Sequence, residues 1–124
     1  MPHFVIDCSE SILYTSVATG STGLDMVKNI LKTVHDTAEQ TGLFKPGDIK
    51  VRICPFQYHY NNGVQTDFIH VFGNIMEGRT TEQKAELSKN IIAKLKHMFP
   101  DVPVISMNIR EFEKATYCNR NMIE

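Results

Sequence analysis

Apolar residues recur at every second position along the first segment of the chain. Phe4, Ile6 and Cys8 point to one side, and the residues between them, beginning with His3, point to the other. Side chains of a β-strand alternate between its two faces, so this period of two is typical of a strand with one buried face. We predict a strand from residue 2 to residue 8.

Two later segments have apolar residues at the three- and four-residue spacing of an amphipathic α-helix. The first extends from Leu24 to Ala38 and the second from Ala85 to Phe99. Thr80 stands where an N-cap is expected, and Gln83, three residues later, completes the pattern of a capping box. Because Pro100 cannot continue a helix, we predict that the second helix begins after Thr80 and ends before Pro100.

Three further segments have the alternation of strands. They run from Ile49 to about Gln57, from Phe68 to Met76 and from Val104 to about Arg110. Asn61-Asn62-Gly63 is a turn signal, which makes a hairpin between the second and third strands plausible. The segment Gly20–Gly23 precedes the first helix but lacks the lysine of a phosphate-binding loop, so we interpret it as a helix-start loop.

The predicted elements follow the order β-α-β, β-α-β. Each β-α-β unit makes a parallel pair of strands joined by a helical crossover. Two such units predict an α/β (α+β) fold, with a four-stranded sheet and both helices on one face. The length of 124 residues suits one domain, residues 1–124. The other face of the sheet needs cover in so small a protein, and self-association is the simplest way to supply it.

The charge balance argues against a strongly charged partner. Lys and Arg together number 13 and Asp and Glu 14, which gives a formal net charge of −1. This balance indicates neither a nucleic-acid nor a membrane partner. No apolar run approaches the roughly 20 residues that span a bilayer, and the first residues do not have the pattern of a signal peptide. We expect a cytoplasmic protein.

The spacing of cysteines and histidines indicates no metal site and no disulfide framework. The three cysteines are far apart and form no C-x-x-C pair, and the five histidines form no H-x-x-x-H pattern. We therefore expect reduced thiols and no bound metal. These residues are Cys8, Cys54, Cys118, His3, His35, His59, His70 and His97.

Pro2 is the first candidate for chemistry. Methionine before a small residue such as proline is normally removed in the cell, which would expose a secondary amine; while Met1 stays attached, the Pro2 nitrogen is an amide. Burial and nearby cations would lower the pKa of the free amine from the ordinary ~7.7–8.0 toward neutrality. A base with such a pKa suits general acid–base catalysis. The alternative is a proline that only begins a strand, where proline is tolerated.

Three cations could bind an anion near such a base. Arg79 directly precedes the helix capped by Thr80, where its guanidinium and the free backbone N–H groups could converge on one carboxylate. Lys50 and Arg52 share one face of the second strand, where they could hold a carboxylate and lower the proline pKa. The alternatives are a solvated arginine in a turn and a solvent-facing side of a strand.

The opening Met-Pro-His-Phe-Val-Ile-Asp-Cys-Ser-Glu-Ser-Ile resembles the start of the 5-carboxymethyl-2-hydroxymuconate delta-isomerase family, which belongs to the tautomerase superfamily. Shorter similar segments spread over most of the chain. They are Thr41–Phe44, Ile49–Arg52, Phe68–Val71 and Gly78–Arg79, with weaker ones at Ile105–Ser106 and Ile109–Glu111.

The resemblance implies a homotrimer of β-α-β repeats that needs no cofactor. By this similarity Pro2 would be the base, Arg79 would bind a substrate carboxylate and Arg52 would assist. The implied substrate is a dicarboxylate with a conjugated enol or ketone, from the breakdown of aromatic compounds. The chain departs from the family pattern at Lys50, where an arginine often stands, and from Ile53 to Asp67, where the family tends to carry tryptophans. Lysine cannot make the planar bidentate contact of arginine, so the exact substrate stays open.

The residues and the resemblance together predict an isomerase that moves a proton between carbons of an unsaturated 2-hydroxy or 2-keto dicarboxylate. Neutral Pro2 would remove the proton and return it further along the conjugated system. Arg79, helped by Arg52 and Lys50, would stabilise the dienolate formed in between. Three alternatives stay open: a ligand-binding module without chemistry, a tautomerase fold that has lost its activity, and a tautomerase that acts on another keto acid or on a halogenated acid.

Overall fold

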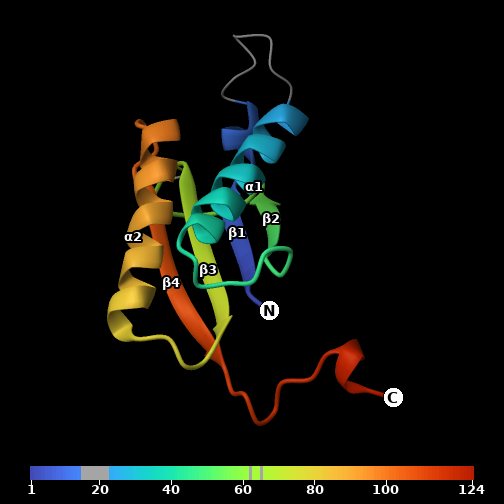
Figure 1. Cartoon of the computed structure of the whole chain (residues 1–124). Helices are drawn as coiled ribbons and strands as arrows, with labels where there is room; N and C mark the ends of the chain where they lie inside the picture. Colours follow the sequence, from blue (N-terminus) through green and yellow to red (C-terminus); the bar gives the residue numbers. More distant parts are fainter. Residues whose placement is uncertain (15–22, 62, 65) are drawn as a thin grey trace.

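Four strands and two long helices make up the fold in the computed structural model, which describes residues 1–14, 23–61, 63, 64 and 66–124 (Figure 1). Residues 20–22 of the predicted helix-start loop lie outside the described residues. Neither long helix in the described ranges is apolar enough to cross a membrane. The elements are β1 (His3–Ser9), α1 (Gly23–Gln40), β2 (Lys50–Phe56), β3 (Phe68–Met76), α2 (Thr81–Met98) and β4 (Val104–Phe112), with short 3-10 helices at Glu10–Tyr14 and Arg120–Met122.

The strands form one sheet in the order β2-β1-β3-β4. β1 pairs with β2 in parallel and with β3 antiparallel, and β3 pairs with β4 in parallel. Both helices cover the same face of the sheet and contact each other (Figure 1). The predicted fold class, a four-stranded sheet from two β-α-β units with both helices on one face, is confirmed.

The predicted hairpin between the second and third strands is wrong, because β1 lies between β2 and β3. The turn signal acts only locally: Asn61 and Val64 exchange backbone hydrogen bonds of 2.7 and 3.0 Å. β1 and β3 are buried at every second position, whereas β2 is half-buried or exposed throughout. The two more apolar strands therefore take the centre of the sheet, and β2 is left at an edge.

The core lies between the sheet and the two helices. Side chains at every second position of β1 and β3 are buried there, as their alternation predicted. Each fully buried aliphatic side chain of this kind contributes roughly 1.5–3 kcal/mol relative to an exposed one. The buried set includes Phe4, Ile6, Cys8, Ile30, Val34, Ile69, Val71, Ile75, Leu87, Ile91 and Leu95.

The capping box predicted at the start of α2 is present. The Thr80 hydroxyl accepts a hydrogen bond from the backbone N–H of Gln83 at 3.1 Å, and the Gln83 side-chain oxygen accepts one from the backbone N–H of Thr80 at 2.9 Å. At the other end, the backbone N–H of Phe99 bonds to the Leu95 carbonyl at 2.9 Å, directly before Pro100. Both predicted ends of this helix are confirmed.

The strand register brings four strand ends together at one end of the sheet. β1 and β2 begin there, and β3 and β4 end there, with β4 reaching Phe112, past the predicted end at Arg110. His3 lies opposite Lys50 on one side and opposite Asn74 on the other. Side chains on the face of the sheet opposite the core, such as those of His3, Lys50 and Asn74, therefore lie close together beside the N-terminus.

Candidate active site

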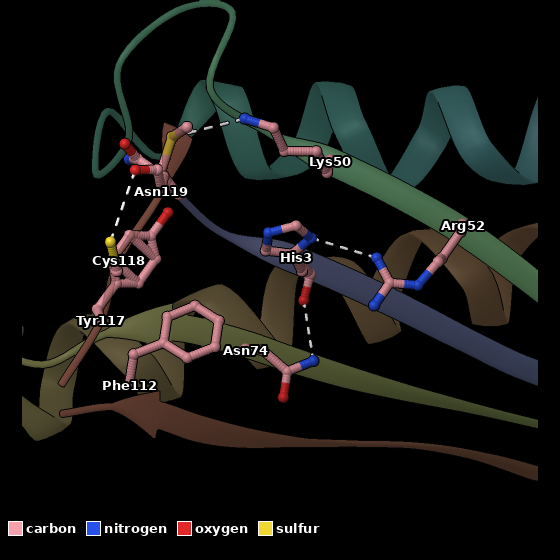
Figure 2. Close-up of a pocket in the computed structure, with 9 residues that line it drawn as sticks. His3, Lys50, Arg52, Asn74, Phe112, Tyr117, Cys118 and Asn119 are labelled. Atoms are coloured by element: carbon pink, nitrogen blue, oxygen red, sulfur yellow. Dashed lines mark hydrogen bonds between the residues drawn. The ribbon is translucent and has the colours of Figure 1, made fainter. Parts of the chain in front are cut away.

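A pocket of about 470 Å³ opens at this end of the sheet. Figure 2 shows its side chains facing one another from the strand ends and from the C-terminal tail. Two cations give the pocket positive charge, and two aromatic rings give it an apolar wall. The lining residues are Met1, His3, Lys50, Arg52, Asn74, Phe112, Tyr117, Cys118 and Asn119.

Pro2 is buried at the start of β1, with a side chain less than 2% exposed. Its neighbours in the chain, Met1 and His3, both line the pocket. The Pro2 carbonyl oxygen accepts a hydrogen bond from the backbone N–H of Lys50 at 3.0 Å, which fixes the proline beside β2. Met1 is still attached in this structure, so the Pro2 nitrogen is an amide and Met1 carries the free amine.

The free amino group lies where a positive charge is disfavoured. Burial lowers the pKa of the Met1 amine from its ordinary value of 8.0. The charges of Lys50 and Arg79 lower this pKa further, and Asp48 opposes them. Burial and cations therefore act on this end of the chain in the direction that a neutral amine requires.

Lys50 and Arg52 both reach the pocket, as their shared face on β2 predicted. Lys50 Nζ donates a hydrogen bond to the Asp48 carbonyl oxygen at 2.6 Å and lies 3.6 Å from Met1 Sδ. Arg52 Nη1 lies 3.2 Å from His3 Nδ1. An ammonium group has three N–H donors and a guanidinium five, so each cation keeps donors beyond these contacts.

Arg79 does not line the pocket with Lys50 and Arg52. Its Nη1 donates to the Met76 carbonyl at 3.1 Å and its Nη2 donates to the Leu43 carbonyl at 2.7 Å. The guanidinium also lies over the Phe44 ring, with Cζ 5.1 Å from the ring centroid. Arg79 thus ties the start of α2 to the loop after α1, and it acts on the N-terminus through its charge.

His3 and Asn74 are pocket residues for which the sequence pattern indicated no role. Burial lowers the pKa of the His3 imidazole, and Arg52, Lys50 and the terminal amine lower it further. The His3 carbonyl oxygen accepts a hydrogen bond from Asn74 Nδ2 at 3.1 Å across the β1–β3 pair. Alternation alone could have placed His3 on the same side as the cations, but Asn74 joins them only through the register of β3.

The C-terminal tail after β4 folds back to the pocket (Figure 2). The Phe112 ring meets the His3 ring at a steep angle with 6.2 Å between centroids, and the Tyr117 ring lies 5.6 Å from Phe112. Between them, the backbone N–H groups of Thr116 and Tyr117 bond to the Glu113 carbonyl at 3.2 and 3.1 Å. This turn directs the tail over the strand ends.

Comparison with known families gives the pocket its context. A family model described as 5-carboxymethyl-2-hydroxymuconate isomerase matches residues 2–124. The chain belongs to this family. It is therefore an isomerase, and the resemblance carried by its opening residues is confirmed over almost the whole chain. Among curated proteins, none matches this isomerase by sequence.

Solved structures of related proteins share the fold of this isomerase. A 5-carboxymethyl-2-hydroxymuconate isomerase from Deinococcus radiodurans R1 matches with a TM-score of 0.75 and 18% identity, over 96% of this chain and 88% of that one. Pt0534, in a structure described as inactivated by 2-oxo-3-pentynoate, matches with a TM-score of 0.74 and 17% identity, over 98% and 94%. A fused 4-OT described as a symmetric trimer matches with a TM-score of 0.71 and 14% identity, over 96% and 92%. At these identities the likeness is one of fold.

Proposed function

We propose that this isomerase moves a proton between carbons of an unsaturated 2-hydroxy or 2-keto dicarboxylate without a cofactor, and that Pro2 is its base once Met1 has been removed. The position of Pro2 carries the proposal. The residue is buried at the start of β1, lies between two pocket-lining residues and is hydrogen-bonded to the strand that bears Lys50 and Arg52.

The surroundings of the amine support a neutral Pro2. Removal of Met1 moves the terminal amine onto Pro2, one residue further into the same environment. Burial and the charges of Lys50 and Arg79 already lower the pKa of the Met1 amine. They would act on a more deeply buried proline nitrogen in the same direction. Removal of Met1 would also take its sulfur away from Lys50 Nζ, which then gains a donor for the substrate.

The proposed reaction balances within the substrate and one amine. The Pro2 nitrogen takes a proton from a carbon next to the conjugated carbonyl, and the electron pair of the C–H bond forms a new double bond. The carbonyl electrons move to oxygen, which produces a dienolate. The protonated proline then returns the proton to a carbon further along the chain of double bonds, so no proton or electron is gained or lost overall.

The cations have separate proposed roles. Lys50 and Arg52 lie in the pocket and would hold a substrate carboxylate and offset the charge of the dienolate. Arg79 would contribute by lowering the pKa of the proline. The carbonyls of Met76 and Leu43 take two of the five N–H donors of Arg79, so the guanidinium also keeps donors with which it could bind a carboxylate directly.

We further propose that the isomerase assembles as a homotrimer. The 4-OT structure that shares its fold is described as a symmetric trimer. The face of the sheet opposite α1 and α2 also holds half-buried apolar side chains, including Val5 and Phe72, which alternate with the buried residues of β1 and β3. Native mass spectrometry of the purified protein tests the assembly, and a monomer at micromolar concentration would contradict it.

Intact-mass measurement paired with an activity assay tests the proline base. The protein expressed in cells should lack Met1, and it should accelerate ketonisation of a 2-hydroxymuconate-type dienol, in which the proline takes the proton of the enol hydroxyl and returns it to a carbon of the same dienolate. Pro2→Ala should remove this turnover, because alanine supplies a primary amine without the fixed ring geometry of proline. A matched variant, Pro46→Ala in the exposed loop before β2, should keep the activity of the wild type.

Two results would contradict the proposal in different ways. If Pro2→Ala kept full activity, the isomerase would use another base. If the processed protein turned over no such dienol or keto acid, the pocket would belong to a binding module or to a tautomerase fold without this activity.

A further inference from the structure

We propose that His3 is a catalytic residue of this isomerase, whose Nε2–H donates a hydrogen bond to the substrate carbonyl oxygen as that oxygen becomes an enolate. The inference rests on the proposed function, because it assigns a residue to the oxygen of the dienolate that Pro2 would create. It assigns a role to His3, a pocket residue that has no role in the proposed function.

The contact between Arg52 and His3 fixes the tautomer of the imidazole. Arg52 Nη1 lies 3.2 Å from His3 Nδ1. A guanidinium has only donors and stays charged at every physiological pH, so Nδ1 must be the ring nitrogen that accepts. The single proton of the neutral ring therefore sits on Nε2.

The same contacts aim Nε2 into the pocket. Figure 2 shows Nδ1 turned toward Arg52 and the second ring nitrogen on the opposite side of the ring, facing the space between Lys50 and the C-terminal tail. The Phe112 ring packs at a steep angle against the imidazole, with 6.2 Å between centroids. Asn74 holds the backbone of His3 through its carbonyl at 3.1 Å. The donor is thus held in place from three sides before a substrate arrives.

The surroundings also keep the ring neutral. Burial and the positive charges of Arg52 and Lys50 lower the pKa of His3. A neutral imidazole can polarise a carbonyl by hydrogen bonding without transferring its proton, which leaves proton transfer to the proline. A protonated ring would instead add a charge beside the terminal amine and lose the acceptor that holds Arg52.

The positions of Lys50 and His3 suit a 2-keto acid. The two residues are register partners on adjacent parallel strands, which lie about 4.8 Å apart. In a 2-keto acid the carboxylate and the carbonyl stand on neighbouring carbons. A carboxylate held by Lys50 therefore places the keto oxygen on the side of His3, where Nε2–H can donate to it.

Two substitutions separate this role from simple support of Arg52. His3→Asn can keep an acceptor at the position of Nδ1 but has no donor at the position of Nε2, whereas His3→Gln can keep an amide donor near the position of Nε2 but has no acceptor at the position of Nδ1. We expect His3→Asn to lower kcat for dienol ketonisation by about 100- to 1000-fold with little change in KM, since the lost bond forms mainly in the transition state. His3→Gln should keep kcat within about tenfold, and His97→Asn, on the exposed side of α2, should match the wild type.

A higher kcat in His3→Asn than in His3→Gln would overturn the inference, because it would mean that His3 matters only as the partner of Arg52. Equal kcat values in the wild type, His3→Asn and His3→Gln would overturn it too. This test can fail independently of the test of the proposed function. Full activity in Pro2→Ala would show that proline is not the base, and the difference in kcat between His3→Asn and His3→Gln would still report whether His3 donates to the substrate.

A measurement without turnover checks the donor directly. Nitrogen-15 NMR of the imidazole should find His3 protonated at Nε2 and not at Nδ1 in the processed protein at neutral pH. The Nε2–H signal should then shift when 2-oxoadipate, a saturated 2-keto dicarboxylate, is added to saturation. A proton on Nδ1, or a His3 signal unchanged by 2-oxoadipate, would overturn the inference even if the assay dienol were not a substrate.

Discussion

The backbone N–H of Lys50 donates a hydrogen bond to the carbonyl oxygen of Pro2 over 3.0 Å. This bond is the first one of the parallel β1–β2 pair, and it couples the first residues of the chain to the strand that bears the pocket cations. Because the next bonds of the pair hold the register, the side chains of Lys50 and Arg52 stay at fixed positions along the strand from Pro2. The sheet therefore positions the proposed base relative to the proposed anion site.

Replacement of Lys50 by methionine should weaken substrate binding. The lysine lines the pocket and offers donors to a carboxylate, and a hydrogen bond to a charged group contributes about 1.5–3 kcal/mol. We expect Lys50→Met to raise KM for a 2-hydroxymuconate-type dienol by about 10- to 100-fold. Lys50→Arg should keep KM nearer the wild type, and Lys45→Met, at an exposed lysine of the preceding loop, should leave it unchanged. Equal KM values in Lys50→Met and the wild type would exclude Lys50 from carboxylate binding.

Removal of the Arg79 charge should raise the pKa of the terminal amine. Arg79 is one of the groups that lower the pKa of the Met1 amine from its ordinary value. We expect its charge to act in the same direction on the Pro2 amine of the processed protein, so its loss should shift that pKa upward. The rate at which an amine-acylating reagent labels the terminal amine of the processed protein reports this pKa, because only the neutral amine reacts. We expect the midpoint of the labelling rate against pH to move to higher pH in Arg79→Met.

Arg79→Lys keeps the positive charge and should leave the labelling midpoint close to that of the wild type. Arg120→Met, at an exposed arginine of the tail, serves as the control for a general change in charge. A midpoint that stays in place in Arg79→Met would mean that Arg79 acts only through its bonds to the carbonyls of Met76 and Leu43.

The pH dependence of stability should carry a contribution from His3. Its pKa in the folded protein is lowered by burial, Arg52, Lys50 and the terminal amine, so the unfolded chain takes up a proton first as the pH falls. Stability from the neutral ring is complete above the unfolded pKa of about 6.5 and is lost as the pH falls from there toward the lower folded pKa.

Urea unfolding at a series of pH values measures this contribution. Between about pH 7.5 and about pH 5, the decline in unfolding free energy should be shallower in His3→Gln than in the wild type. His97→Gln, at an exposed helix position, should show the slope of the wild type. The same slope in all three proteins would mean that His3 titrates alike in the folded and unfolded states.

Local signals predicted the elements well, because the forces that they report act between residues close in the chain. The capping box at Thr80 and Gln83 needs only a turn of helix, and it is present as predicted. The alternation from Phe4 to Cys8 reports which face of β1 is buried, and that face lies in the core. The same argument applied to β2 predicted that Lys50 and Arg52 share one face of the strand, and both line the pocket.

Features that depend on contacts between distant segments were not predictable in this way. Asn61 signals a turn, but the partner of β2 is decided by competition among strands for the centre of the sheet. Asn74 enters the pocket through the register of β3 with β1, and Tyr117 enters it through a turn after β4. Arg79 was predicted from its position before α2 to bind an anion, whereas its bonds to the carbonyls of Met76 and Leu43 depend on segments that no local pattern brings together.

Loss of the cap on α2 should destabilise the protein. Thr80→Ala removes the hydroxyl that accepts from the backbone N–H of Gln83, and such a substitution costs about 0.5–2 kcal/mol. Thr80→Ser keeps the oxygen and should restore most of the difference. Thr81→Ala, at the exposed first residue of the helix, should not lower stability, since alanine is the better helix former. Urea unfolding monitored by far-ultraviolet circular dichroism measures all three, and equal losses in Thr80→Ala and Thr81→Ala would argue against the cap.

Gly73 should be hard to replace because β4 packs closely against it. A Cβ at this position would lie 2.8 Å from Ile109 Cδ1 and 2.9 Å from Met107 Cε. Alanine normally improves a strand relative to glycine, so a loss of stability in Gly73→Ala would come from this overlap. We expect the loss to be about 1–3 kcal/mol, the usual cost of overpacking a core.

Ile109→Val provides the rescue that tests the cause of this loss. Valine lacks the Cδ1 atom that approaches closest to position 73, so the double variant should lose less stability than the sum of the two single losses. Urea unfolding of the four proteins gives the coupling energy directly. If the stability losses of Gly73→Ala and Ile109→Val simply add, the cost at position 73 comes from its backbone or from Met107. The Ile109 side chain would then not limit the size of the residue at position 73.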